Sequence, residues 1–303
     1  MREKTRQHYI PKFYLKNFIG MDNQPTVYDK VERKSHPAKL DSICYENFLY
    51  DIAPDFATFD DGTTKVSFIE DTILSKEIEP QFAKLLNEIN DTLDTIAYNS
   101  TFPEPLRERL AYNIIIQYLR MPQIKQATQQ LNDDILPKMV RLFQQGLAKE
   151  LGDEQIAKLQ LTSKYDVSRT FYEQTFGSEE LVNTFSKAIL DNRWIFLYSP
   201  DGGFYSSDNP CVVIQSTNSR PFCLGLAQFG SEIIYPILPE LAVIIYDRNY
   251  YSDLEVSDNS VNYAQFEHIA HINLNIYEQA KRFVFSKKCD FKLVEQYTYN
   301  GET

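Results

Sequence analysis

The chain has 303 residues, of which 14% are aromatic, and a formal net charge of −11. Its few glycines and many Tyr and Phe residues are typical of an ordered globular protein and exclude a disordered chain. The acidic balance argues against the broad basic surface that binds long nucleic acids. Residues 1–40 nevertheless carry nine Lys/Arg against four Asp/Glu. This basic segment either packs on the acidic body or forms a local cationic patch.

The apolar runs at 194–198 and 241–246 are much shorter than the roughly 20 residues that span a bilayer. The N-terminus is charged and lacks the apolar segment of a secretory signal. The widely spaced cysteines form no CxxC pair, so free buried thiols are expected at Cys44, Cys211, Cys223 and Cys289. These features predict a cytoplasmic protein with no membrane partner.

The first predicted elements are a short helix at 12–18 and a strand at 26–30. Pro11 suits the first helical position and Gly20 suits the stop. A turn-rich segment follows and ends in an aromatic cluster at 45–50.

The sequence pattern in the middle of the chain predicts a block of helices. Apolar residues recur every three or four positions from 66 to 96, which indicates one long amphipathic helix bent at Pro80. Another helix is expected between Pro103 and Pro122. The stretch 124–190 has a helical pattern that is interrupted near two glycines, Gly152 and Gly177.

Beyond residue 192 the pattern changes to short β-rich runs that are separated by Gly, Pro, Asn and Ser. The predicted strands are 194–198, 204–206, 211–215, 233–235 and 241–246, followed by a helix near 260–280 and a strand at 282–286. Two isolated strands are marginal in water, so the short N-terminal strands are expected to join the mostly antiparallel C-terminal sheet. The sequence therefore predicts an α+β fold in one domain, 1–303, with N-terminal strands and turns at 1–60, a helical block at 65–192, and the sheet with the last helix at 193–290.

Gln7-His8-Tyr9, with Lys12 nearby, is the first group of candidate site residues. His8 can act as a general base, bind a metal or donate to a phosphate, because its near-neutral pKa and two nitrogens suit all three roles. The alternative is a structural histidine. The predicted fold would bring His8 close to the C-terminal motifs.

Glu70 and Glu77 are seven residues apart and would share the apolar face of an α-helix. A buried carboxylate there needs an ion pair, a hydrogen bond or a cation. Alternatively the face is only partly buried and the carboxylates point outward, which is the expectation for Glu77 and Glu79.

Asn113, Gln117 and Arg120 form a polar stripe along one helix face. The planar guanidinium of Arg120 suits a carboxylate or phosphate, although an ordinary solvated face has the same pattern. A further polar group, Ser206 to Pro210, lies between two predicted strands, where loops often carry function. Asp-Asn-Pro is also a good turn in its own right.

Familiar cofactor and catalytic motifs are missing from the sequence. It contains no GxGxxG, P-loop, HExxH or GxSxG pattern, so dinucleotide-binding, zincin and α/β-hydrolase functions have no local support. His268 and His271 are spaced at i, i+3 on the last predicted long helix. Without a ligand partner at a recognised spacing, they are expected to be surface or packing residues.

Taken together, these motifs resemble the bacterial domain-of-unknown-function family 4238. The resemblance rests on the QHYIPKFYLKNF stretch at 7–18, the strand at 27–29, the aromatic step at 46–50, Glu70 with Glu77 or Glu79, and Gln117, Arg120 and Pro122. Ser-Asp-Asn-Pro at 207–210, Tyr-Pro-Ile at 235–237, Asn273 and the strand at 280–286 complete it. It implies one domain and no established activity. Polar residues in a shared pattern are hard to explain by core packing, so His8, Glu70, Gln117, Arg120 and Asp208 are expected to converge on one pocket.

The leading functional hypothesis is a hydrolase of a phosphodiester or nucleotide-like anion, such as a small nucleotide or a short single strand. His8, Glu70 and Asp208 are the expected catalytic residues, and together they could hold Mg²⁺ or Mn²⁺. Gln7, Tyr9, Gln117, Arg120, Ser207 and Asn209 are the expected substrate-binding residues. The alternative is a non-catalytic module that senses a small ligand or peptide, with bacterial defence as a further hypothesis. The sequence leaves the oligomeric state open.

Overall fold

The computed structural model describes residues 5–20, 26–52, 62–147, 167–177, 179–215, 225–254 and 256–300. The strands are β1 (Arg6–His8), β2 (Thr26–Asp29), β3 (Lys34–Pro37), β4 (Tyr45–Asn47), β5 (Arg193–Tyr198), β6 (Ser206–Ser207), β7 (Val212–Gln215), β8 (Ser231–Leu238), β9 (Leu241–Tyr246), β10 (Ser260–Tyr263) and β11 (Phe283–Phe285). The helices are α1 (Lys12–Asn17), α2 (Glu79–Asn99), α3 (Glu104–Leu119), α4 (Pro122–Leu147), α6 (Val167–Phe176), α7 (Glu179–Leu190), α8 (Phe266–Gln279) and α9 (Lys292–Asn300), with a π-helix at Ile69–Ile78 and 3₁₀ turns at Leu40–Ser42 and Gly225–Ala227. The predicted α+β class is confirmed.

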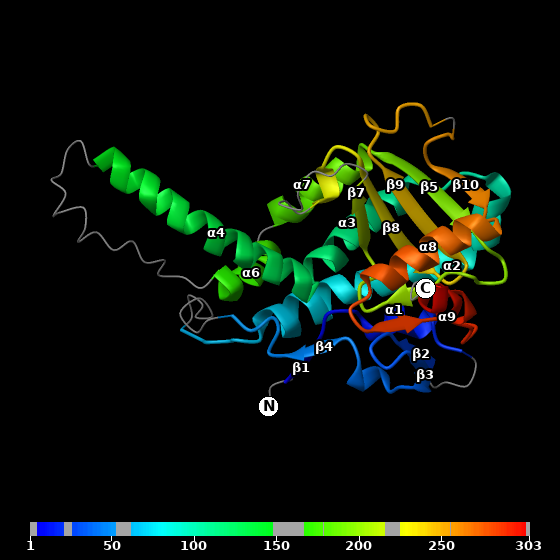
Figure 1. Cartoon of the computed structure of the whole chain (residues 1–303), viewed down its shortest axis with the longest axis horizontal. Coiled ribbons are helices and arrows are strands. Elements are labelled where there is room, and N and C mark those ends of the chain that lie inside the picture. The colour runs from blue at the N-terminus through cyan, green and yellow to red at the C-terminus, as the bar shows by residue number, and fades with distance from the viewer. Residues whose placement is uncertain are drawn as a thin grey trace.

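The larger sheet has five strands in the order β10-β5-β9-β8-β7, and only its β10–β5 pair is parallel. Successive side chains along its strands pack into two different hydrophobic cores, one on each face of the sheet. In β5, Trp194 and Phe196 pack on one face and Leu197 packs on the other. Helices α2, α3 and α7 cover the first face and α8 covers the second (Figure 1). A sheet that is buried on both faces accounts for the nearly continuous apolar runs of β5, β8 and β9.

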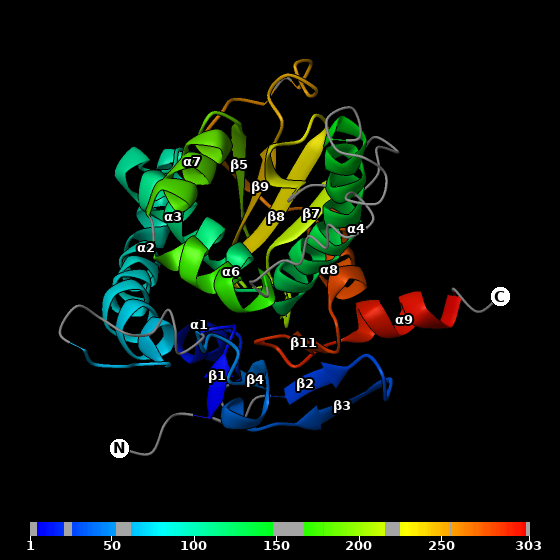
Figure 2. The same cartoon turned by 90° about the vertical axis from the view of Figure 1, so that its left-hand side faces the viewer.

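A second sheet, ordered β3-β2-β11-β6, joins the two ends of the chain. β2 pairs antiparallel with β11, which places Tyr28 opposite Val284. Figure 2 shows β2, β3 and β11 side by side below the larger sheet. β2 therefore pairs with a C-terminal strand, as predicted, but it does not extend the larger sheet, and β3 pairs with β2. The other N-terminal strands, β1 and β4, pair with each other in a separate two-stranded antiparallel sheet, which corrects the prediction that they join the C-terminal sheet. In the larger sheet, β10 pairs with β5 and forms the edge strand. The sequence had predicted the start of a helix at this position.

The predicted helix at 66–96 is two helices of different winding. Residues Ile69–Ile78 form a π-helix, and α2 continues from Glu79, with Pro80 in its first turn rather than at a bend. The Ser75 hydroxyl donates to the carbonyl of Glu70, five residues earlier. A π-turn holds more residues than an α-turn, so a spacing of seven no longer returns to the same face. Accordingly, Glu70 is buried and Glu77 is exposed.

Several smaller differences separate the prediction from the structure. The sequence did not predict β3 or α9, and the Gly152 break falls outside the described residues. Cys44 and Cys211 are free and buried as expected, whereas Cys289 is free and exposed; Cys223 is not among the described residues. Within the described ranges, none of the helices combines the length and apolar character that a bilayer-crossing segment needs.

Asp29 anchors the join between β2 and β11, and its replacement is expected to destabilise the protein. Its fully buried carboxylate accepts the backbone N–H groups of Val31 and Glu32 and pairs with Arg282. Burial raises the pKa of Asp29, but Arg282 and the two N–H groups outweigh it and hold that pKa below its usual range. We expect Asp29→Ala to lower the free energy of unfolding by about 2 kcal/mol in urea titrations. Glu32→Ala, which removes an exposed carboxylate from the same network, should change it by less than about 0.5 kcal/mol.

The contribution of Asp29 should also depend on pH in a defined direction. A carboxyl group whose pKa is lowered by folding stabilises the protein above its ordinary pKa, and loses that contribution as the pH falls through the folded value. The difference between wild type and Asp29→Ala should therefore be full at neutral pH and shrink in acid. An equal difference at all pH values would contradict this role of the ionised carboxylate.

Candidate functional site

The alternation of side chains along β1 divides the N-terminal motif between two environments. Gln7 is fully buried: its Oε1 accepts the backbone N–H of Tyr50 at 2.6 Å, and its Nε2 donates to Asp51 at 2.6 Å. Successive side chains of a strand point to opposite faces, so Arg6 and His8 face the other way. Gln7 thus fastens β1 to the 50–51 turn, while Arg6 and His8 line a pocket.

This pocket has a volume of about 580 Å³. It lies between β1, the start of α1, the 3₁₀ turn at 40–42 and the junction of the π-helix with α2. Its lining combines basic, acidic and neutral side chains: Arg6, His8, Pro11, Lys12, Phe13, Asp41, Glu70, Ser75 and Glu79. The predicted catalytic residues His8 and Glu70 therefore share one pocket. Asp41 is paired with Lys12, and Arg6 contacts the carbonyl of Asp41.

The ring of His8 is half-buried and neutral at physiological pH. Burial is the main cause that lowers its pKa below 6.5, and the positive charge of Lys12 adds to it. His8 Nε2 lies 3.3 Å from the carbonyl oxygen of Leu40, a group that only accepts hydrogen bonds. This contact assigns the proton to Nε2 and leaves Nδ1 as the basic nitrogen.

Arg120 and Gln117 hold the backbone of the N-terminal motif. The buried guanidinium of Arg120 donates through Nη2 to the carbonyl of His8 at 2.7 Å and to Glu79 at 2.8 Å. Gln117 Nε2 donates to the carbonyl of Tyr9 at 2.9 Å. Burial disfavours the charge of Arg120, but Tyr50 and Glu79 outweigh it and raise its pKa. The expected proximity of His8 and Arg120 is present, through the His8 backbone rather than its ring.

These contacts change how the predicted substrate clamp is understood. The donors that the sequence assigned to a substrate oxyanion, on Gln117 and Arg120, bind carbonyls of the chain itself. Tyr9 is buried on the face of the motif opposite His8, and its phenol lies near Cys44 and Asp208. The structure therefore makes Gln117 and Arg120 positioning residues for His8.

Asp208 serves the second sheet rather than the pocket. Its buried carboxylate accepts three backbone N–H groups, from Lys281 at 2.8 Å, Arg282 at 2.7 Å and Phe283 at 3.0 Å. Burial raises its pKa, and the three donors oppose that effect.

The neighbours of Asp208 also have local partners. Ser207 Oγ accepts the N–H of Asn209 at 3.0 Å, and the Asn209 amide donates to the carbonyl of Gln279 at 3.1 Å. Among the described residues that line the pocket, none comes from 207–209. The Ser-Asp-Asn-Pro motif thus forms a turn between β6 and β7 whose Asp208 binds the backbone at the start of β11, in line with the alternative that the sequence had left open. The expected convergence of Asp208 with His8 and Glu70 does not occur.

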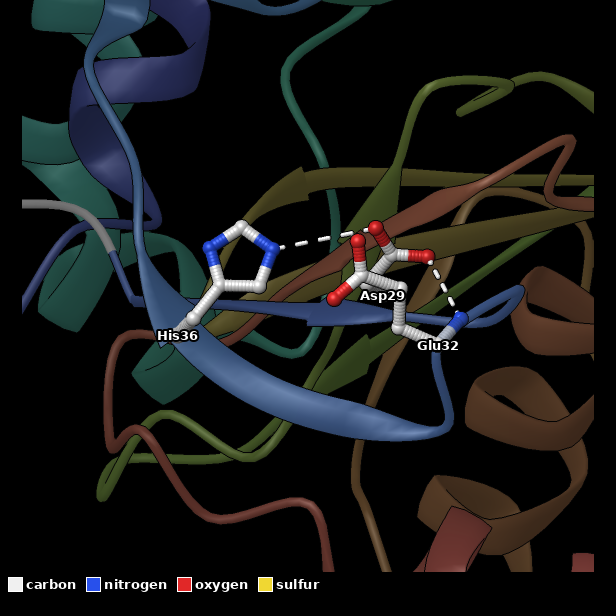
Figure 3. Close-up of side chains that lie close together, drawn as sticks. All are labelled: Asp29, Glu32 and His36. Atoms are coloured by element: carbon white, nitrogen blue, oxygen red, sulfur yellow. Dashed lines mark hydrogen bonds and ion pairs between the residues drawn. The ribbon is translucent and has the colours of Figure 1, made fainter.

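One cluster of possible metal ligands lies elsewhere. In the described part of the chain, three or more His, Cys, Asp or Glu donors come within 4.8 Å of one another only at Asp29, Glu32 and His36 (Figure 3). Asp29 Oδ2 already accepts a hydrogen bond from Arg282 Nε at 2.9 Å, and it lies 3.7 Å from His36 Nε2. Because the guanidinium stands where a cation would be needed, this cluster is an ion-pair network of the β2–β11 join. The sequence-predicted Mg²⁺ or Mn²⁺ set of His8, Glu70 and Asp208 is not assembled.

The two histidines of α8 have local structural roles, as the sequence predicted. His268 accepts the backbone N–H of Gln265 and completes a capping box at the start of the helix. His271 Nε2 lies 2.9 Å from Glu232 Oε1, and this hydrogen bond raises its pKa. The acidic partner comes from β8, so no sequence spacing could have indicated it.

The sequence reasoning missed Arg6, Asp41 and Glu79 as residues of the pocket. A signal for Arg6 was present, because residues i and i+2 of a strand share a face and His8 was already a candidate. Glu79 was expected to be solvated, but it is the partner of Arg120. Asp41 reaches the pocket from the 3₁₀ turn at Leu40–Ser42, which carried no recognisable pattern.

Replacing Asp208 should test whether it is structural or catalytic. We expect Asp208→Ala to lower the free energy of unfolding by at least about 2 kcal/mol, because it leaves three buried N–H donors without their acceptor. Urea titration measures this loss, with Asp201→Ala, at an exposed aspartate between β5 and β6, as the control. A stable Asp208→Ala protein that has lost a measured activity would instead restore the catalytic assignment.

Comparison with known proteins connects this geometry to a family. A search of curated proteins and a search of solved structures each returned no match for this chain. A family model described as "Protein of unknown function (DUF4238)" matches residues 6–290, a range that starts at β1 and includes every residue of the pocket. The chain therefore belongs to the DUF4238 family.

Proposed function

We propose that this chain is a hydrolase of a phosphodiester or nucleotide-like anion, and that the pocket beside β1 is its active site. The observation that supports this best is His8, a neutral, half-buried imidazole that lines the same pocket as the buried carboxyl of Glu70. A titratable group with a shifted pKa that shares a pocket with other charged side chains is a frequent mark of acid–base chemistry. The bonds from Gln117 and Arg120 fix the backbone that carries His8, as a general base requires.

The chemistry follows from the groups in the pocket. His8 Nδ1 takes the proton of a water molecule as the water oxygen forms its bond to phosphorus. Arg6 and Lys12 stabilise the negative charge that develops on the phosphoryl oxygens. As the bond to the leaving oxygen breaks, that oxygen takes a proton, and Glu70 is the second group in the pocket that can transfer one.

The substrate class is limited by size and charge. A pocket of about 580 Å³ accommodates one small nucleotide or the end of a short single strand. The net charge of −11 disfavours a long duplex, which needs an extended basic surface. We therefore propose a small phosphodiester or a short oligonucleotide end as the substrate.

The chief alternative is a non-catalytic sensing module that binds a small ligand or a peptide in the same pocket. It is favoured by one observation: the best anion donors, on Gln117 and Arg120, are bound to the chain itself. A pocket with fewer preorganised donors can hold a ligand without stabilising a transition state.

Turnover by a His8 variant distinguishes these functions. The purified chain is assayed with bis(4-nitrophenyl) phosphate and a panel of dinucleotides and cyclic nucleotides. We expect turnover of at least one of them, and a loss of about 100-fold or more in His8→Ala, because a general base contributes that much. His268→Ala, at an exposed histidine outside the pocket, should remain within about twofold of wild type.

Two outcomes would contradict the hydrolase proposal. The first is turnover that His8→Ala and Glu70→Gln leave unchanged. The second is thermal stabilisation by a nucleotide with no product over hours, which would establish the sensing module instead.

The titration of His8 is a test that needs no substrate. Because burial and Lys12 lower its pKa, His8 should titrate in the folded protein with a midpoint below 6.5. The same ring charges at higher pH when the chain is unfolded, so this residue destabilises the fold as the pH falls below 6.5. NMR of the imidazole signals, assigned with His8→Ala, measures the midpoint. A value above 6.5 would remove the neutral base from the proposal.

A further inference from the structure

A second cavity, of about 560 Å³, lies on the other side of the π-helix. Residues of the π-helix, α2, α3, α6 and α7 line it. Its lining includes three aromatic rings, Phe68, Tyr112 and Phe176, and an apolar floor to which Ile73 and Ile116 contribute. None of its described lining residues belongs to the pocket beside β1.

The π-helix distributes its carboxylates between the two cavities. Glu70 lines the first cavity, together with Glu79 from the start of α2, whereas Glu77 lines the second. The winding of the π-helix therefore sends Glu70 and Glu77 to opposite sides. Inserted π-turns often occur at functional sites, and here one forms a wall between two cavities.

The charges at the second cavity are mainly negative. Glu77 and Glu179 both line it and are exposed. Its cationic side chain, Arg109, is paired with Glu88 at 2.7 Å. The two carboxylates both act on the phenol of Tyr112, whose pKa is raised by burial and then by Glu179 and Glu77. Both carboxylates line the same cavity as Tyr112.

Aromatic faces beside carboxylates are complementary to an organic cation. Aromatic rings attract an ammonium group through their quadrupoles, and the carboxylates add ordinary ion pairing. Phe68 already has the ammonium group of Lys65 over its ring at 5.7 Å, so the ligand cation is expected nearer to Tyr112 and Phe176. The apolar floor would cover the hydrocarbon part of such a ligand, and the volume is within the range of small-molecule sites. An anionic ligand would meet two carboxylates and an arginine that already has its partner.

We propose that this second cavity is a binding site for an organic ammonium compound with an apolar or aromatic body. It is separate from the pocket of the proposed hydrolase and does not depend on that activity.

The test uses three probes that share one ring system and differ in charge. Tryptamine carries a cation, tryptophol is neutral and indole-3-acetate is an anion. Isothermal titration calorimetry with the full chain should show that tryptamine binds most tightly and indole-3-acetate least. We expect Glu77→Gln and Glu179→Gln each to weaken tryptamine about three- to fivefold, as partly exposed ion pairs do. Glu108→Gln, the same charge change at an exposed position of α3 outside the cavity, should have no effect.

Glu179 starts α7, where its charge also favours the helix, so melting temperatures are measured for all variants. If Glu179→Gln does not fold, Glu77→Gln alone decides, because its side chain is exposed on the π-helix. His8→Ala should bind tryptamine as wild type does, which separates this site from the pocket beside β1. Any one of three results would overturn the proposal. These are equal binding of the three probes, no binding of tryptamine at millimolar concentration, and equal effects of Glu77→Gln and Glu108→Gln.

Discussion

The arrangement of the pocket depends on one buried cation, the guanidinium of Arg120. It binds the carbonyl of His8, the carboxylate of Glu79 and the phenol of Tyr50, which belong to three different parts of the chain. A buried charge is tolerated only where such partners surround it, so the three must be in place together. The position of His8 is therefore fixed through its own backbone, and the imidazole remains available to the pocket.

The sequence predicted the α+β class, the principal helices, most strands of the larger sheet and the pairing of the two chain ends. Those features follow from apolar periodicity and from turn residues, which are local signals. For the site, it predicted that His8, Glu70, Gln117 and Arg120 would lie near one another, and His8 and Glu70 do line one pocket, but it could not predict what Gln117 and Arg120 bind. Whether Arg120 contacts a substrate or a backbone carbonyl depends on partners that are 41 and 112 residues away along the chain.

Three differences from the prediction have specific physical causes. Gln7, His8 and Tyr9 were treated as one group, although neighbouring residues of a strand cannot face the same side. Glu70 and Glu77 were placed on one face because an α-helical repeat was assumed where the winding is that of a π-helix. The third concerns Asp208, a carboxylate at the end of a strand that was expected in the pocket with His8 and Glu70. It accepts three backbone N–H groups, and nothing local to Ser-Asp-Asn-Pro identifies the donors at 281–283.

The pairing of β2 with β11 has a consequence for biosynthesis. Residues 26–29 leave the ribosome early, but their partners at 283–285 are made more than 250 residues later. Contacts this distant in sequence form slowly, and an unpaired strand edge is exposed to other chains in the interval. The helical segments between them rely on nearer contacts and can collapse first. The second sheet would then form last. A truncated nascent chain would hold a formed helical core while it still lacked this sheet.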